Sequence, residues 1–348
     1  MGFHSRTEVV RAYQDGSFPR LVYRRTLRTE RRCTMSRLIG KWWIAVLLVW
    51  LFPSCDHKEL CFDHGHMVSL DIRFDWSEAP DASPRTMVVQ FFHMDGSFYT
   101  SRELPLATGG KVRVEADEYM LLFHNGEMEF VGEDGNTYDS FWLYTKPQSI
   151  LDPMGRGGLA TLPPEATAGE PVRGIPEVVW GGRHAYLNVQ RGIEGQSVTL
   201  KPTEVTTWYT IEVCNVENMD PMLDVSGALS GMCEGWRLKE GVSAGVSVTM
   251  PFELERRYDE KKLVARFPVF GHCPIEEGKH TFFIYTSRQT YYNFDVTDKI
   301  HNGDGDVDEP KEIHIVIDDG IKLPPATGGM TPSIDGWDDV VNNDINMD

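Results

Sequence analysis

Apolar and polar residues alternate along much of this chain in short segments. From residue 68 to residue 76, apolar side chains occupy every second position and polar or charged ones lie between them. Side chains of a β-strand point alternately to opposite faces, so a period of two predicts a strand with one buried face. Asp95-Gly96 between two further segments predicts a tight hairpin. Strands are predicted over residues 68–76, 87–94, 98–104, 111–115, 119–125, 178–180, 185–189, 197–200, 208–216, 225–229, 246–252, 263–269, 281–285, 291–296 and 313–317.

Turn-forming residues separate these segments about every ten positions, which is typical of a β-sandwich or barrel. The pattern holds neither long amphipathic helices nor alternating strand–helix units, so a parallel α/β sheet is not expected. We therefore predict an all-β protein with two β-sandwich domains, over residues 67–194 and 195–322. A stretch rich in proline and glycine, residues 144–172, is expected to be a long loop or a set of edge excursions.

Residues 323–348 are predicted to be a linker followed by a C-terminal strand or tail. Apolar side chains recur there among aspartates and asparagines. Two interpretations stay open: this stretch is the last strand of its own domain, or it is an exchange strand that pairs with a partner. The apolar residues of the stretch are Ile334, Trp337, Val340, Val341 and Ile345.

Near the N-terminus an apolar run over residues 42–52 ends at Pro53-Ser54-Cys55. It is too short for a membrane-spanning helix, which needs ~20 residues. Basic residues precede the run and a small residue precedes Cys55, as in a lipoprotein signal peptide. We predict a signal peptide over residues 35–54 and a mature chain that begins at Cys55 with acyl chains such as palmitate. An uncleaved anchor or cleavage elsewhere is the alternative, because the residues at 52 and 53 depart from the usual lipoprotein pattern.

The segments on either side of this signal are not expected to fold. Residues 1–34 are rich in arginine, lack apolar periodicity and precede a second methionine, Met35. We predict that they are a non-native extension, with an unusually long signal n-region as the alternative. Residues 55–66 are predicted to be a lipidated tether. Since each buried methylene contributes ~0.8 kcal/mol, two or three acyl chains hold a protein stably on a membrane outside the cytoplasm.

The charge of the chain disfavours one class of partner. From Cys55 onward there are 24 basic and 49 acidic residues, a net charge of −25. Nucleic-acid binding needs a basic surface, so it is not expected. Five cysteines remain in this part and fit no zinc-binding spacing. One or two disulfides, or buried thiols, are both compatible with the sequence.

The sequence contains only weak matches to metal-binding and catalytic motifs. Asp304, Asp306 and Asp308 resemble the start of a calcium loop, but the glycine and glutamate expected at later positions are missing. Residues 241–245 match the GxSxG pattern of a nucleophile elbow, yet a predicted strand follows where that motif needs a helix. The sequence therefore predicts no enzyme, no cofactor and at most a weak calcium site.

The positions of the tryptophans relative to the predicted strands separate core residues from candidates for surface contacts. Trp76 and Trp208 occupy alternating positions of predicted strands, so we assign them to the core. Trp142 and Trp180 lie on either side of the irregular middle stretch. They are the better candidates for aromatic contacts at the surface.

Several features together resemble one family. They are the leader from Cys55 to Cys61, the alternating first strand, the segment over residues 225–232 and the tail around Gly336-Trp337-Asp338 and Ile345-Asn346-Met347. This combination is similar to the fimbrillin-related lipoproteins of the Bacteroidales, close to fimbrial anchor and accessory subunits. The resemblance covers essentially all of the chain after the signal peptide.

The resemblance implies two tandem transthyretin-like, Greek-key sandwiches on a lipid anchor in the outer membrane, exposed at the cell surface. It also implies pairing with fimbrial subunits, in which one subunit's groove receives a strand of its neighbour. A first strand of the kind that proteases remove from stalk subunits is not identifiable here, which favours an anchor or accessory role. The alternative function is a surface glycan-binding lipoprotein of a carbohydrate-uptake system, with polysaccharide as the partner.

Overall fold

A computed structural model describes residues 67–156, 169–274, 279–301, 312–326 and 337–339, with residues 338 and 339 described by their backbone only. Strands make up almost all of the regular structure in these ranges, so the all-β prediction is confirmed. The helical elements are the single turn η3 (Asp152–Met154) and the short helix α2 (Thr297–His301). No helix in the described ranges is long and apolar enough to cross a membrane.

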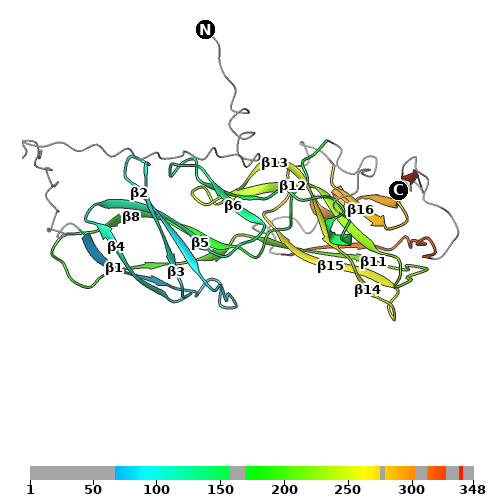
Figure 1. Ribbon diagram of the computed structural model, residues 1–348, viewed down its shortest axis with the longest axis horizontal. Coiled ribbons are helices and arrows are strands. Elements are labelled where there is room, and N and C mark those ends of the chain that lie inside the picture. Colours follow the sequence, from blue (N-terminus) through cyan, green and yellow to red (C-terminus); the bar gives the residue numbers. More distant parts are fainter. Residues whose placement is uncertain (1–66, 157–168, 275–278, 302–311, 327–336, 340–348) are drawn as a thin grey trace, which may run out of the picture. The chain divides into compact units, whose positions relative to one another are not determined.

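The first group of strands forms two facing sheets around one apolar core (Figure 1). The smaller sheet has the order β4-β1-β9, and the larger has the order β10-β8-β5-β2-β3. The predicted first strand is confirmed, and Val68, Leu70 and Ile72 point into the core. The bounds are β1 (Met67–Phe74), β2 (Met87–His93), β3 (Phe98–Leu104), β4 (Gly109–Glu115), β5 (Glu118–Asn125), β8 (Trp180–Asn188), β9 (Gln196–Leu200) and β10 (Thr203–Glu204).

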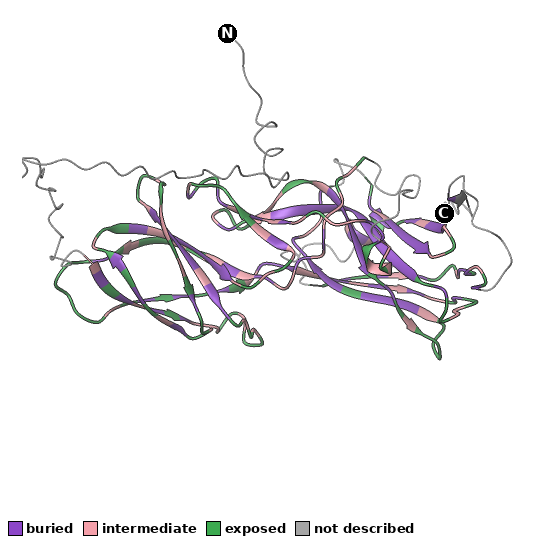
Figure 2. Ribbon diagram, viewed as in Figure 1, coloured by how far each residue is buried: buried purple, intermediate pink, exposed green. Residues whose placement is uncertain are grey.

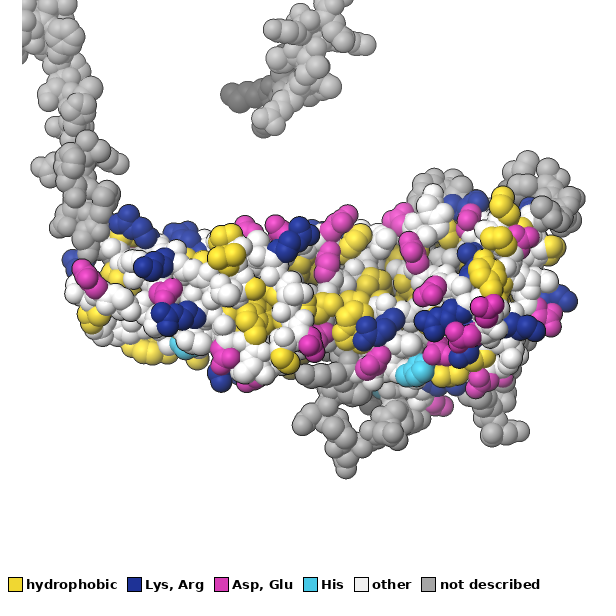
Figure 3. Space-filling model, turned by 90° about the horizontal axis from the view of Figure 1, so that it is seen from below, with side chains coloured by type: hydrophobic (Ala, Val, Ile, Leu, Met, Phe, Trp, Pro, Cys, Tyr) yellow, Lys and Arg dark blue, Asp and Glu magenta, His cyan; other side chains and the backbone are white. Residues whose placement is uncertain are grey.

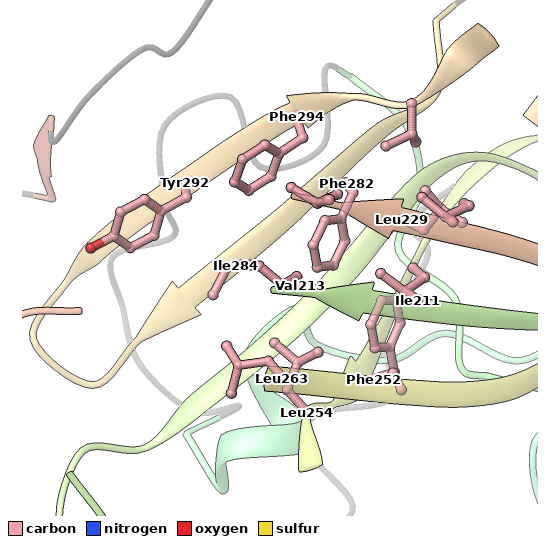
Figure 4. Packing of buried hydrophobic residues seen from close by; sticks show 14 of the residues in the cluster. Ile211, Val213, Leu229, Phe252, Leu254, Leu263, Phe282, Ile284, Tyr292 and Phe294 are labelled. Atoms are coloured by element: carbon pink, nitrogen blue, oxygen red, sulfur yellow. The ribbon is translucent and has the colours of Figure 1, made fainter. Parts of the chain in front are cut away.

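The second group also packs two sheets against each other. One has the order β14-β15-β11-β18; in the other β12 pairs with β13 and β16, and β17 and β19 continue from β16. Figure 4 shows side chains of the core between them, among them Ile211, Phe252 and Phe282. The bounds are β11 (Thr207–Val213), β12 (Val225–Arg237), β13 (Val242–Glu253), β14 (Glu255–Arg257), β15 (Lys262–Val269), β16 (Thr281–Thr286), β17 (Thr290–Asp295), β18 (Glu312–Ile317) and β19 (Asp338–Asp339).

Strand β12 is longer and more buried than the sequence predicts. The predicted strand ended at Leu229, but β12 continues to Arg237, and all residues from Val225 to Gly235 are buried (Figure 2). Small residues allow this. A Cβ at Gly227 would lie 2.5 Å from the ring of Phe252, so the ring packs directly on the backbone. Burial of both faces removes the alternation on which the prediction of its end depended.

A hairpin that the sequence analysis missed connects the two groups. Strands β6 (Val131–Asp134) and β7 (Trp142–Thr145) pair with each other, and β7 also pairs with β12. Their apolar side chains belong to a cluster that includes Phe92 and Leu122 of the first group and Leu238 and Phe270 of the second. Each strand has only four residues, too few for a periodic signal.

The predicted division at residues 194 and 195 can be compared with the strand pairing. Strands β9 and β10, which follow residue 195, pair with β1 and β8 of the first group. Strand β11 is the first that pairs with strands of the second group. The residues from Asp63 onward form one compact unit by their contacts, so the division into two domains stays a prediction.

Candidate functional site

The C-terminal residues that the structure describes lie against the sheet of β12, β16 and β17. In this sheet Leu229, Phe282 and Ile284 face the core, while Ala228, Phe283 and Tyr285 face the other side. Trp337 packs on that other side, with its ring edge-on to Tyr285 at 6.0 Å between ring centroids. Strand β19 then pairs in parallel with the first two residues of β17. We name this arrangement the Trp337 site.

The Trp337 site is apolar and closed. Trp337 is only 8% exposed and Tyr285 is fully buried. Ile150 and Leu151, from the loop that crosses the sheet before η3, complete the cluster. Burial raises the pKa of the Tyr285 phenol above its ordinary value. Removal of the C-terminal segment would therefore expose an aromatic surface beside the edge of a strand.

Other sheet edges have a different character. Strand β3 lies at an edge of its sheet, and its central residues are polar or charged, as in Arg102 and Glu103. The edge strand β14 has three residues, Glu255 to Arg257. Charged and short edges resist pairing with other chains. At the Trp337 site, by contrast, main-chain pairing and an aromatic pocket occur together, which is the combination that recognises an added strand.

A cavity of about 450 Å³ lies beside Trp180. Trp208 also lines it, so the assignment of Trp208 to the core is wrong: its ring is half-buried, because Arg266 lies over it at 3.9 Å and Glu204 accepts a hydrogen bond from its indole N–H. Trp76, which was also assigned to the core, is partly buried and packs against the core of the first group of strands. We name this cavity the Trp180 pocket.

Trp142 lies apart from the Trp180 pocket. It is half-buried in β7 and its ring is 5.6 Å from that of Tyr144. The residues that line the pocket come instead from the loop after β1, from β8, β10, β11 and β15. On the face seen in Figure 3, acidic and basic side chains lie interspersed with hydrophobic ones. The acidic excess is therefore not gathered into a single patch on this face.

Three histidines that the sequence analysis did not connect meet in the second group of strands. Nε2 of His280 lies 2.8 Å from Nε2 of His301, and the ring centroid of His272 is 4.7 Å from that of His301. The hydroxyl of Tyr209 is 2.7 Å from Nδ1 of His272. Burial lowers the pKa of His272 to about 4 and also lowers that of His280. We name these three residues the histidine cluster.

The histidine cluster is not arranged as a metal centre. Among the residues that the structure describes, no group of three or more His, Cys, Asp and Glu side chains could hold a metal ion. His272 lies in the loop after β15, His280 directly before β16 and His301 at the end of α2, so the packing of these three segments brings the rings together. No spacing signal could have predicted the cluster.

Several predicted site residues lie outside the described residues. They are the proposed lipid-bearing Cys55, the weak calcium ligands Asp304, Asp306 and Asp308, and Ile334, Val340, Val341 and Ile345 of the C-terminal stretch. These predictions stay predictions.

Comparison with known proteins identifies the family. A family model described as "Domain of unknown function (DUF5119)" matches residues 54–253. The chain belongs to the DUF5119 family. Among curated proteins, this DUF5119 protein is 21% identical over 329 residues to the "Putative fimbrium anchoring subunit Fim4B" of Bacteroides ovatus, a match that covers 82% of this chain and 92% of that one.

A solved structure with a TM-score above 0.5 shares the fold. A crystal structure of a "putative adhesin" from Bacteroides ovatus aligns with a TM-score of 0.55 at 19% identity, over 74% of this chain and 93% of that chain. The fimbrial anchor protein Mfa2 from Porphyromonas gingivalis aligns with a TM-score of 0.44 at 13% identity, over 72% and 90% of the two chains. The resemblance to fimbrial proteins of the Bacteroidales that the sequence indicated is confirmed.

Proposed function

We propose that this DUF5119 protein is a non-enzymatic protein of the cell surface that serves as an anchor or accessory subunit of a fimbria. The observation that carries the proposal is its similarity, over most of both chains, to a protein named as a fimbrium anchoring subunit. The all-β fold, shared with a protein named as an adhesin, supports the same role. In this proposal the two groups of strands are tandem transthyretin-like sandwiches that transmit load and present edges, and they carry out no reaction.

The proposed attachment to the outer membrane is through acyl chains on Cys55. The apolar run before this residue and the polar tether after it support the proposal. The family match begins at residue 54, next to the proposed cleavage point, which agrees with a mature chain that starts at Cys55.

We expect mass spectrometry of the protein from its native membranes to find an N-terminal peptide that begins at Cys55 and carries fatty acyl chains. Exchange of Cys55 for serine removes the thiol that would bear the lipid. That variant should leave the membrane fraction almost completely, because a lost pair of acyl chains removes most of the anchoring free energy. Exchange of Cys214 for serine is the matched control and should stay membrane-bound. An unmodified Cys55 in the native protein would contradict the proposed anchor.

The proposed pairing with a partner subunit involves the Trp337 site. Here the C-terminal stretch that contains Ile334, Trp337, Val340, Val341 and Ile345 either leaves β17 to enter a partner's groove or is replaced by a partner's strand. Within the described residues, Asp338 and Asp339 pair in parallel with the start of β17, and this main-chain pairing at a strand edge supports an exchange. The aromatic pocket under Trp337 gives the side-chain specificity that strand addition requires.

Deletion of residues 334–348 is expected to leave the two cores folded and to abolish co-purification with fimbrial subunits. The cores survive because Trp337 packs on the outer side of the sheet, in a cluster separate from the main core. Circular dichroism would check folding, and affinity purification from cross-linked cells would check assembly. Trp337→Phe, which keeps an aromatic ring in the pocket, is the control and should keep assembly. Unchanged incorporation of the truncated protein into fibres would contradict the role of this stretch.

Glycan binding stays the alternative prediction. The Trp180 pocket favours it, because an indole face beside carboxylates such as Glu204 suits the apolar face and hydroxyl groups of a sugar. Trp142 lies outside this pocket and would take no part at the same site.

A further inference from the structure

Two cysteines of the second group, one in β12 and one in the loop after β15, meet at an irregular point of β12. Cys233 belongs to β12, and Cys273 lies in the loop that follows β15. The N–H of Cys233 donates a hydrogen bond to the carbonyl of Gly271 at 3.1 Å. The N–H of Cys273 donates to the carbonyl of Gly231 at 2.8 Å. These bonds form a short antiparallel bridge that fixes the backbone positions of both cysteines.

The two sulfur atoms already touch. Sγ of Cys233 lies 3.5 Å from Sγ of Cys273, and both residues are buried, at 6% and 4% exposure. The residue opposite each cysteine in the bridge is a glycine, so neither cysteine faces a side chain of its paired residue. A disulfide needs a sulfur separation of about 2.05 Å, so the sulfurs must approach by about 1.5 Å. In the proposed bond, rotation of the two side chains supplies this movement.

We propose that Cys233 and Cys273 form a disulfide in the exported protein. The compartment rests on the proposed surface location, because disulfides persist outside the cytoplasm. One thiol loses its proton and its thiolate attacks an external protein or glutathione disulfide, which releases one thiol of that reagent. The second thiolate then displaces the other. In total two protons and two electrons leave the cysteine pair, and one external disulfide is reduced to two thiols.

Burial of both sulfur atoms determines when the disulfide can form. Neither sulfur is open to an external disulfide in the folded protein, so the bond forms while the second group of strands is still folding. The bond closes a loop between positions that are 40 residues apart, and this loop contains β13, β14 and β15. It therefore ties the sheet of β12 covalently to the sheet of β15.

Cys214 is a built-in control. It lies at the end of β11, where its N–H donates to the carbonyl of Ile317. Burial, together with a hydrogen bond to Asp318, raises the pKa of its thiol, which lowers its reactivity. It should stay a thiol under conditions in which Cys233 and Cys273 are joined.

The test uses the full-length protein from its native cells, denatured in the presence of N-ethylmaleimide and digested without reductant. Trypsin and a glutamate-specific protease together cut at Glu217, which separates Cys214 from Cys233. We expect a cross-linked peptide pair that contains Cys233 and Cys273, and an alkylated Cys214. Recovery of Cys233 and Cys273 both alkylated would overturn the proposal.

A thermal measurement gives a second readout. Reduction under unfolding conditions, followed by refolding with reductant, should lower the Tm of the wild type by about 5–10 °C. The variant Cys214→Ala should show the same shift, and the double variant Cys233→Ala, Cys273→Ala should show none. An equal shift in the double variant would overturn the proposal.

Refolding of the reduced protein in a glutathione redox buffer separates two causes of failure. A cross-link that forms there but is absent from cell material would show that the proposed location is wrong. Failure to form in either sample would show that the sulfur pairing is wrong.

Discussion

Replacement of Gly109 by alanine is expected to lower the free energy of unfolding by about 3–5 kcal/mol. Gly109 is the first residue of β4 and pairs with Arg73 of β1. Its φ is +104°, and an added Cβ would lie 2.0 Å from the carbonyl oxygen of Ile72. Both the left-handed backbone and the collision with a paired strand oppose a side chain here. The substitution must therefore push β4 away from β1.

Gly96 provides the matched control for Gly109. It also has a positive φ, +86°, in the turn between β2 and β3, but an added Cβ would meet nothing within 4 Å. Gly96→Ala should cost about 1 kcal/mol, the backbone part alone. Urea unfolding followed by circular dichroism would measure both. Equal losses for the two variants would show that the contact with Ile72 does not hold β4 in place.

A fall in pH from 7 to 4 is expected to destabilise the protein by about 2 kcal/mol through His272 of the histidine cluster. Burial lowers the pKa of His272 in the folded state to about 4, whereas the unfolded side chain titrates near 6.5. The unfolded state therefore binds more protons between these values, and stability falls with pH. The stabilisation is complete above pH 6.5 and is lost progressively toward pH 4. Because His272 is half-buried, solvent screens part of the full linkage value of about 3 kcal/mol.

Substitution of His272 separates this effect from general acid denaturation. His272→Gln keeps a polar side chain near the Tyr209 hydroxyl but cannot be protonated, so the difference in stability between pH 7 and pH 4 should shrink. His314→Gln is the control, because His314 is exposed on β18 beside Glu212. Urea midpoints at several pH values would show the slopes. An unchanged slope in His272→Gln would mean that other groups carry the acid sensitivity.

Neighbouring rings also affect protonation within the histidine cluster. Nδ1 of His280 donates a hydrogen bond to the carbonyl of Ser230, and Nε2 of the same ring lies against Nε2 of His301. Besides burial, repulsion from His301 and His280 lowers the pKa of His272, so a charge on a neighbouring ring opposes protonation of His272. The loss of stability on acidification should therefore spread over a wide pH range rather than follow a single step.

Local alternation was enough to predict most strands of this protein. Strand β1, β18 and the hairpin after Asp95-Gly96 follow directly from a period of two and from turn residues. They agree with the structure because each strand has one face in a core and one in water. Alternate side chains are therefore buried, and alternate residues are apolar. The all-β class and the resemblance to fimbrial proteins depended on such local features, and both hold.

Tertiary structure decided what local pattern could not encode. Strand β12 is buried on both faces, so its sequence carries no alternation at the end where it pairs with β7. The histidine cluster, the contact of Cys233 with Cys273 and the position of Trp337 over Tyr285 all join residues far apart in the chain. The sequence by itself determined which residues prefer strands and which faces prefer burial. Only the pairing of strands determined which side chains meet, because contacts between distant segments depend on the register and order of whole sheets.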